Sequence, residues 1–184
     1  MFQWGGWGYP QHGPKKPWPK MIDDFDVEAF AHMVEDAGAG YVIWSATWCS
    51  YHFPAPVKAI DRIAPGHTSQ RDLMVYLPSG APAADPVARK AFGWQWGSPG
   101  GWQLPGEPIG GRLAEFQRNW EAVIREWSRR WGYSVSGWWI DGCHFADQMY
   151  RFGDEPNFAS FARVLRAGKP FLLGRGNADA VLCL

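Results

Sequence analysis

The chain lacks an excess of charge of either sign, because its 184 residues carry 18 Lys and Arg against 18 Asp and Glu. A protein without a basic surface offers no electrostatic footprint for nucleic acid and no attraction to anionic lipid. The sequence also lacks any apolar run near the roughly 20 residues of a membrane span, and its start lacks the charged-then-apolar form of a signal peptide. We therefore expect no nucleic-acid partner, no membrane partner and, for the chain as given, a cytoplasmic location.

Cysteine is scarce, and several catalytic motifs are missing. The three cysteines, Cys49, Cys143 and Cys183, cannot all pair within one chain, so we interpret them as reduced. The segments Cys49-x-x-His52 and Cys143-His144 match no known metal-ligand spacing and carry no signature of a cysteine nucleophile. No G-x-S-x-G, G-x-G-x-x-G or phosphate-loop motif is present. We therefore expect no metal and no cofactor, and the missing motifs argue against a serine hydrolase or a nucleotide-binding protein.

Tryptophan, by contrast, is abundant, with 13 residues in the chain. Indole rings fill crowded cores, and they also stack on flat apolar faces such as those of sugar rings. Three tryptophans follow a helical spacing that predicts a place in the core: Trp120, Trp127 and Trp131. Three others lie at or near the ends of expected strands, where an aromatic ring can form the base of a sugar-binding site: Trp4, Trp48 and Trp139. Three more lie in a long loop and fit either role: Trp94, Trp96 and Trp102.

Strands and helices are expected to alternate along the chain. The strand-like runs are continuously apolar and fall at residues 41–45, 73–77, 135–140, 171–173 and 180–184, with residues 1–4 as a further short candidate. The helical patterns fall at residues 27–37, 113–131 and 157–167, with a short helix near Pro56, and the longest loops at residues 5–25 and 78–110. Strands that are apolar on both faces are typical of a parallel sheet with helices outside.

Such a sheet can close in two ways, as an open doubly wound sheet or as a (β/α)8 barrel. The missing nucleotide-binding motifs remove the main support for the first. We therefore predict that residues 1–184 form one α/β domain of the (β/α)8-type, a TIM barrel. Because a complete barrel needs about 250 residues, we expect an incomplete one with about five of its strands. Its open edge, at residues 180–184, would expose unpaired backbone groups and favour self-association.

The carboxyl ends of the strands are where functional groups of such folds lie. Asp141 follows the strand predicted at residues 135–140 and is the carboxylate best placed by this rule. A carboxylate that substrate reaches between apolar walls suits a nucleophile or a general base. The alternative is an Asp that caps the next turn with the help of Gly142. His12 and His52 lie in loops just after expected strands and are candidate ligand contacts.

Four segments of the chain carry motifs that occur in the same order in a known family. They are Gln3-Trp4-Gly5, the passage from Phe25-Asp26 to Ala37-Gly38-Ala39-Gly40-Tyr41-Val42, the run Leu73-Met74-Val75-Tyr76-Leu77-Pro78-Ser79, and Trp138-Trp139-Ile140-Asp141-Gly142. They resemble, in that order, the His-Trp-Gly, F-D…A-G-A-x-Y-x-V, G-x-Y-x-S and W-x-D motifs of the α-L-fucosidase family of glycoside hydrolases. Gln3 stands where the family has His, and His52 is the nearest imidazole to its Lys-His-His-Asp-Gly-Phe segment.

This resemblance implies a retaining glycosidase with a carbohydrate substrate, in which Asp141 is the nucleophile that forms the glycosyl-enzyme. The residues then expected in the sugar pocket are Gln3, Trp4, Trp48, His52, Tyr76, Trp139 and His144. The motifs assign no acid/base, and the nearby carboxylates are Glu107, Asp147, Asp154 and Glu155. The alternative is a non-catalytic or degenerate sugar-binding barrel. An isomerase or aldolase-type barrel has less support, because no Lys follows a predicted strand.

Overall fold

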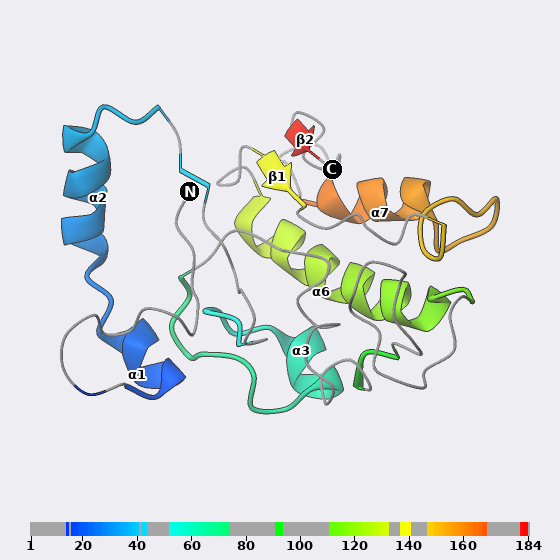
Figure 1. The fold of residues 1–184 in the computed structure, drawn as a ribbon, viewed down its shortest axis with the longest axis horizontal. Coiled ribbons are helices and arrows are strands. Elements are labelled where there is room, and N and C mark those ends of the chain that lie inside the picture. Colours follow the sequence, from blue (N-terminus) through cyan, green and yellow to red (C-terminus); the bar gives the residue numbers. More distant parts are fainter. Residues whose placement is uncertain are drawn as a thin grey trace.

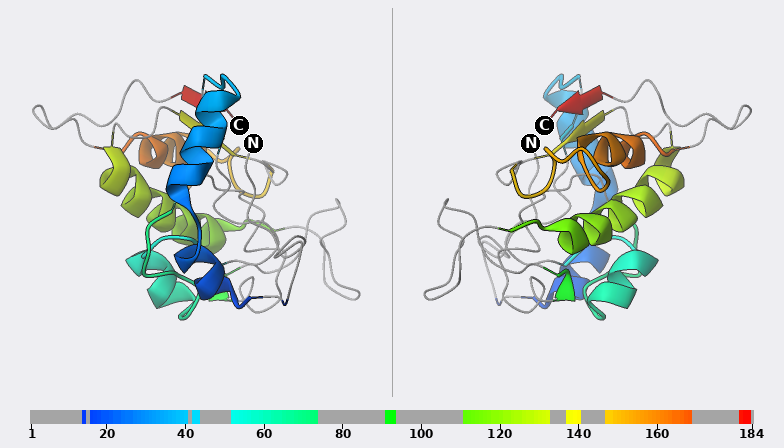
Figure 2. Two further views of the ribbon diagram at one scale, coloured as in Figure 1. Left: turned by 90° about the vertical axis from the view of Figure 1, so that its left-hand side faces the viewer. Right: turned by 90° about the vertical axis from the view of Figure 1, so that its right-hand side faces the viewer.

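The computed structural model describes residues 14, 16–40, 42–43, 52–73, 91–93, 111–132, 137–140, 147–168 and 181–183. In chain order their elements are α1 (Trp18–Asp23), α2 (Val27–Asp36), α3 (Lys58–Ile63), α6 (Ala114–Trp131), β1 (Gly137–Trp139), α7 (Phe158–Leu165) and β2 (Val181–Cys183) (Figure 1). The long helix α6 has α3 on one side and α7 on the other, and both pack against it (Figures 1 and 2). Helix α6 is therefore the element around which the described part of the molecule is organised.

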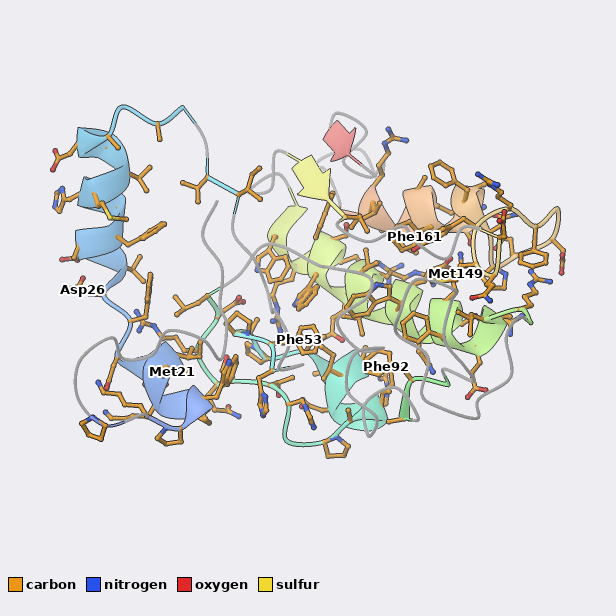
Figure 3. The ribbon with its side chains drawn as sticks, in the orientation of Figure 1. Met21, Asp26, Phe53, Phe92, Met149 and Phe161 are labelled. Carbon is orange, nitrogen blue, oxygen red and sulfur yellow. The ribbon has the colours of Figure 1, made fainter. Side chains whose placement is uncertain are left out.

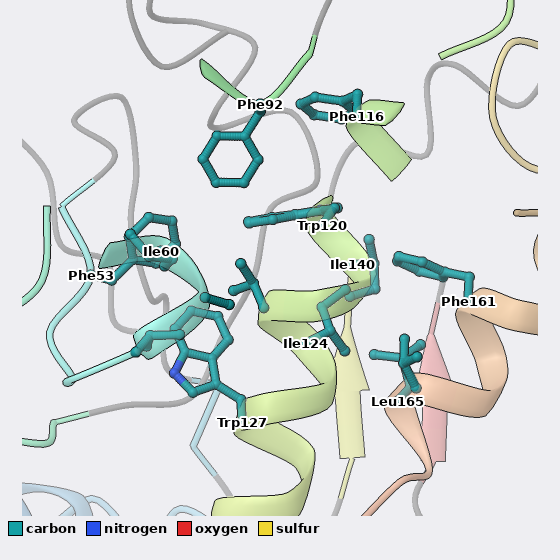
Figure 4. Packing of buried hydrophobic residues seen from close by; sticks show 14 of the residues in the cluster. Phe53, Ile60, Phe92, Phe116, Trp120, Ile124, Trp127, Ile140, Phe161 and Leu165 are labelled. Atoms are coloured by element: carbon teal, nitrogen blue, oxygen red, sulfur yellow. The ribbon is translucent and has the colours of Figure 1, made fainter. Parts of the chain in front are cut away.

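The apolar stripe of α6 forms the centre of the main hydrophobic core (Figure 4). Its fully buried apolar residues are Phe116, Trp120, Val123, Ile124 and Trp127. They recur at steps of three and four, which brings them to one face of the helix. Phe53 and Ile60 pack on one flank of this stripe, and Phe161 and Leu165 of α7 complete the other. These residues on the two flanks help to bury the apolar stripe of α6.

The helix predicted over residues 113–131 is confirmed, and so is the core position of Trp120 and Trp127. Trp131 is only half-buried, and its ring stacks on that of Trp127 with the centroids 5.4 Å apart. Gly132 ends the helix with φ at 48°, a left-handed conformation that glycine adopts without a steric penalty. Among the described residues, neither α6 nor any other helix is long and apolar enough to cross a membrane.

Strand, helix and strand follow one another in β1, α7 and β2. The two strands are parallel, with Gly137 opposite Val181 and Trp139 opposite Cys183. Helix α7 begins with a capping box, since the Asn157 side chain accepts from the Ser160 N–H at 3.0 Å and Ser160 Oγ accepts from the Asn157 N–H at 2.9 Å. The helix predicted at residues 157–167 and the strand predictions around β1 and β2 are confirmed at their centres.

A parallel pair is compatible with a barrel and with an open sheet, so the (β/α)8 closure stays a prediction. The runs at residues 1–4 and 171–173 lie outside the described residues, as do most of 41–45 and 73–77. Of these last two runs, Val42 and Ile43 are described and lie in no strand. Leu73 is buried beside Ile22 in a second, smaller core cluster.

The prediction of a loop over residues 5–25 is wrong at its end, where the chain forms α1. Pro17 is the N-cap of this helix and Pro19 lies in its first turn. A helix needs no backbone N–H at these positions, so the prolines begin the helix instead of preventing it. Arg71 holds the other end, because its Nη1 donates to three backbone carbonyl oxygens there, at 2.8 and 2.9 Å.

Helix α2 forms where its pattern predicts, but its apolar face is not buried. Asp26 is the expected N-cap, and its side chain accepts from the Ala29 N–H at 2.9 Å. None of the ten residues of α2 is buried, and Val27 and Met33 are 43% and 57% exposed. Figure 3 shows Phe53 and other core side chains gathered around α6, with α2 standing apart from them. The sequence predicts that this helix packs its apolar face on a sheet, but in the structure that face is exposed.

Candidate functional site

The strand predicted to carry the nucleophile is described up to the residue before Asp141. Trp138 of β1 and Ile140, which follows the strand, are 3% and 2% exposed, so the carboxyl end of β1 lies in the core. Catalytic groups of parallel α/β folds lie beyond this end of the strands. Asp141 itself lies outside the described residues, as do five other members of the predicted site: Gln3, Trp4, Trp48, Tyr76 and His144.

Two further residues of the predicted sugar pocket lie within the described ranges. Trp139 is the last residue of β1 and pairs with Cys183. His52 lies in the segment between α2 and α3 and is half-buried. Of these two residues, only His52 has a described side chain, so the geometry known for the predicted sugar pocket is that around His52.

His52 belongs to a stack of three rings. Its imidazole faces that of His67, with the ring centroids 4.8 Å apart and the planes at 23°. The ring of Trp18 also lies near His52, with the centroids 5.2 Å apart and the planes at 34°. The backbone explains this pairing, because the Phe53 N–H donates to the His67 carbonyl at 2.8 Å and the Ser69 N–H donates to the Phe53 carbonyl at 3.1 Å. Two parallel stretches of chain thus hold the imidazoles side by side.

The chemistry of this stack suits a neutral polar ligand. Burial lowers the pKa of His67 below the ordinary value, which favours the neutral form of its ring. A neutral imidazole has one nitrogen that donates and one that accepts a hydrogen bond, and Trp18 adds an apolar ring face. Among the described residues, no group of three or more His, Cys, Asp or Glu side chains could hold a metal ion. The cluster therefore offers hydrogen-bonding imidazole nitrogens beside an apolar ring face.

Sequence reasoning identified His52 and missed Trp18 and His67, its ring neighbours among the described residues. Trp18 falls in a proline-rich stretch that reads as a loop, and His67 lies in a segment without helical or strand periodicity. The one local signal is Gly66, whose φ of 85° lets the chain turn just before His67. The contact itself depends on backbone pairing between segments on either side of α3, which no local pattern reveals.

Arginines engage the described carboxylates that were candidates for the acid/base. Each pair has an N···O distance of 2.7 Å: Asp147 with Arg151, Asp154 with Arg112, and Glu155 with Arg163. The guanidinium hydrogen bonds hold the pKa of Asp154 and of Glu155 below the usual values. A general acid at neutral pH needs a raised pKa, so these two residues are poorly suited to that role. Glu107, the fourth candidate, lies outside the described residues.

A surface pocket of about 280 Å³ lies where α6 meets the turn before α7. Its lining residues are Arg118, Glu121, Ala122 and Arg125 of α6, with Glu155 and Pro156 of the turn. Glu121 is 6% exposed, and its Oε1 accepts from Ser160 Oγ at 2.6 Å and from Gln117 Nε2 at 2.9 Å. The bond from Ser160 ties α6 to the first turn of α7. The pocket was not predicted, because it joins residues that are far apart in the sequence.

Comparison of the chain with protein-family models, with curated proteins and with solved structures finds no match. The resemblance to α-L-fucosidases therefore rests on the four motifs of the sequence. The described elements follow the order α6, β1, α7 and β2, and the two strands are parallel. Many α/β proteins share this arrangement, so it does not identify a family.

Proposed function

We propose that the chain is a retaining glycoside hydrolase of the α-L-fucosidase type, with Asp141 as its nucleophile. The observation that carries the proposal is the β1–α7–β2 unit, in which buried Ile140 follows β1 and directly precedes Asp141. In parallel α/β folds the carboxyl end of a strand is where catalytic groups gather. The W-x-D motif of Trp139, Ile140 and Asp141 points to the same carboxylate by a separate route.

The proposed reaction has two displacements at the anomeric carbon. A carboxylate oxygen of Asp141 attacks this carbon, the bond to the leaving oxygen breaks, and a glycosyl-enzyme ester forms. The leaving oxygen takes a proton from an acid, or departs as an anion where that anion is stable. Water then attacks the anomeric carbon of the ester and gives up a proton to a base or to solvent, while the bond to Asp141 breaks. This releases the sugar with its original configuration and restores the Asp141 carboxylate.

The resemblance assigns the contacts with the sugar to Gln3, Trp4, Trp48, His52, Tyr76, Trp139 and His144. For His52 the stack with His67 and Trp18 supports this role. Rings that are packed against each other lose little conformational freedom when a ligand binds, so they form a preorganised contact surface. We assign His52 a hydrogen bond to a sugar hydroxyl.

The test is hydrolysis of an aryl fucoside by Asp141→Asn. We expect roughly a thousandfold or greater loss of kcat, because the nucleophile is removed. Azide should restore part of the activity to Asp141→Gly, since a small anion can occupy the vacated space. The matched control is Asp154→Asn, which removes a carboxylate that is paired with Arg112 and should leave turnover nearly unchanged. Hydrolysis at the wild-type rate by folded Asp141→Asn would overturn the assignment.

A second function, that of a sugar-binding barrel without a positioned acid/base, is favoured by the ion pairs of Asp147, Asp154 and Glu155. The leaving group separates the two functions. A nitrophenolate departs without protonation, whereas the oxygen of a second sugar needs an acid. Similar kcat/KM values on a nitrophenyl fucoside and a fucosylated oligosaccharide would indicate a complete hydrolase. Binding of fucose without turnover of either substrate would support the binding protein.

A further inference from the structure

The pocket between α6 and the turn before α7 carries two arginines that have no ion-pair partner among the described residues. Arg118 and Arg125 are exposed and lie on α6 seven residues apart, which is about 10 Å along the helix and nearly two full turns. Both side chains therefore leave the helix from the same face. Ala122 lies between them and has no long side chain to fill the space. The two guanidinium groups thus flank an open depression.

Protein groups already engage the carboxylates of this pocket. Glu155 Oε1 accepts from Arg163 Nη2 at 2.7 Å. Glu121 is nearly buried and accepts from Ser160 and Gln117. Arg118 also lies close enough to Asp154, and Arg125 to Glu155, to lower the pKa of each carboxyl. With Arg112 and Arg163 included, four guanidinium groups face three carboxylates, so the balance of charge is positive. The groups left for a ligand are hydrogen-bond donors, and they fit acceptors such as carboxylate or sulfate oxygens.

The position of the pocket relates it to the carboxyl end of β1. In a β–α–β unit the helix after a strand starts at the carboxyl end of that strand, which is the edge where active sites form. Glu155 and Pro156 come just before the first turn of α7. Helix α6 precedes β1, and the starts of α6 and α7 lie at the same end of their packed pair (Figure 1). The pocket therefore lies near the starts of α6 and α7, and in a β–α–β unit this is the end of the helices that corresponds to the carboxyl ends of the strands.

From these observations we propose that the pocket binds the anionic groups, carboxylates or sulfate esters, of an acidic oligosaccharide. The carbohydrate class rests on the proposed function, whereas the preference for anions rests on Arg118 and Arg125 themselves. A guanidinium presents a planar fork of donors that matches two oxygens of one oxyanion. Two such groups on one helix face suit a ligand with negative groups on more than one sugar. The pocket is then an accessory subsite that selects acidic glycans.

Calorimetric titration of the full chain tests this proposal with three probes: a tetrasaccharide that contains uronate residues, a neutral tetrasaccharide of the same length, and inorganic sulfate. We expect the acidic tetrasaccharide to bind most tightly. Arg118→Gln and Arg125→Gln should each weaken its binding roughly tenfold, because each removes one charged hydrogen-bonding partner. Glutamine preserves helix propensity, so α6 should remain intact. The control is Arg129→Gln, an exposed position of the same helix outside the pocket, which should leave the affinity unchanged.

Several outcomes would overturn the proposal. They are no binding of the acidic tetrasaccharide, equal binding of the neutral one, equal binding of inorganic sulfate, or an equal loss of affinity in Arg129→Gln. The titration is repeated with Asp141→Asn, in which we expect the same affinity for the acidic tetrasaccharide. Binding that survives while wild-type turnover is absent contradicts the proposed hydrolase alone. Turnover of an aryl fucoside without binding of the acidic probe contradicts the accessory subsite alone.

Discussion

Helices α6 and α2 both carry an apolar stripe, yet only the stripe of α6 is buried. Trp120 and Trp127 of α6 are fully enclosed by residues of α3, α7 and the segments beside them. In α2 no side chain is buried, and Met33 is 57% exposed. Both helices begin and end close to where the sequence predicts. The comparison shows that an apolar period determines where a helix forms and which face it offers, whereas burial depends on what lies opposite.

The largest effect should follow from truncating the centre of the α6 core. Trp120 lies near two aromatic rings, with centroids 6.2 Å from Phe53 and 5.8 Å from Phe92. Trp120→Ala should lower the free energy of unfolding by about 3–5 kcal/mol, because it leaves a large cavity among these rings. Urea denaturation followed by circular dichroism measures the change. Trp131→Ala, at the half-buried rim, should cost clearly less, and an equal cost would mean that the core is centred elsewhere.

A smaller effect should come from the helix caps, which make the same bond in both regions. Asn157 caps α7 through the Ser160 N–H, and Asp26 caps α2 through the Ala29 N–H. Asn157→Ala should lower the free energy of unfolding by about 1 kcal/mol, since α7 is part of the packed core. Asp26→Ala should leave global unfolding almost unchanged, because α2 buries no side chain.

Hydrogen exchange distinguishes the two caps further. In Asp26→Ala the amides of α2 should exchange faster, while those of α6 keep their protection, because a helix without buried contacts opens locally. In Asn157→Ala the amides of α6 and α7 should lose protection together. Joint loss of protection in α2 and α6 after Asp26→Ala would show that the two regions unfold as one unit.

The elements that sequence reasoning predicted correctly are those whose cause is local. Helix α6 has an apolar stripe at steps of three and four, and α7 has Asn157 at its start. Helix α1 was missed because Pro17 and Pro19 are common both in loops and in the first turn of a helix. Its stability depends in part on Arg71, whose bonds to the end of the helix cross 46 to 49 residues of sequence.

The site shows the same division between local and distant causes. The position of Asp141 after a strand is a local property, and the strand before it formed as expected. The ion pair of Arg112 with Asp154 joins residues 42 positions apart, and the stack of His52 on His67 depends on backbone pairing across α3. A sequence pattern can therefore identify a carboxylate as a candidate acid, whereas the groups around it in the folded protein determine its pKa.

The smallest effect is expected at Met33, and it bears directly on the predicted barrel. Met33 is 57% exposed on α2, whereas Met149 is 1% exposed beside the core of α6. Met149→Ala should lower the free energy of unfolding by about 2–5 kcal/mol, and Met33→Ala should change it by less than about 0.5 kcal/mol. In a closed (β/α)8 barrel the outer helices pack their apolar faces on the sheet, so Met33 would be buried there. Urea denaturation of the two variants side by side distinguishes these arrangements: equal losses would contradict the exposed face of α2 and favour a helix packed on a sheet.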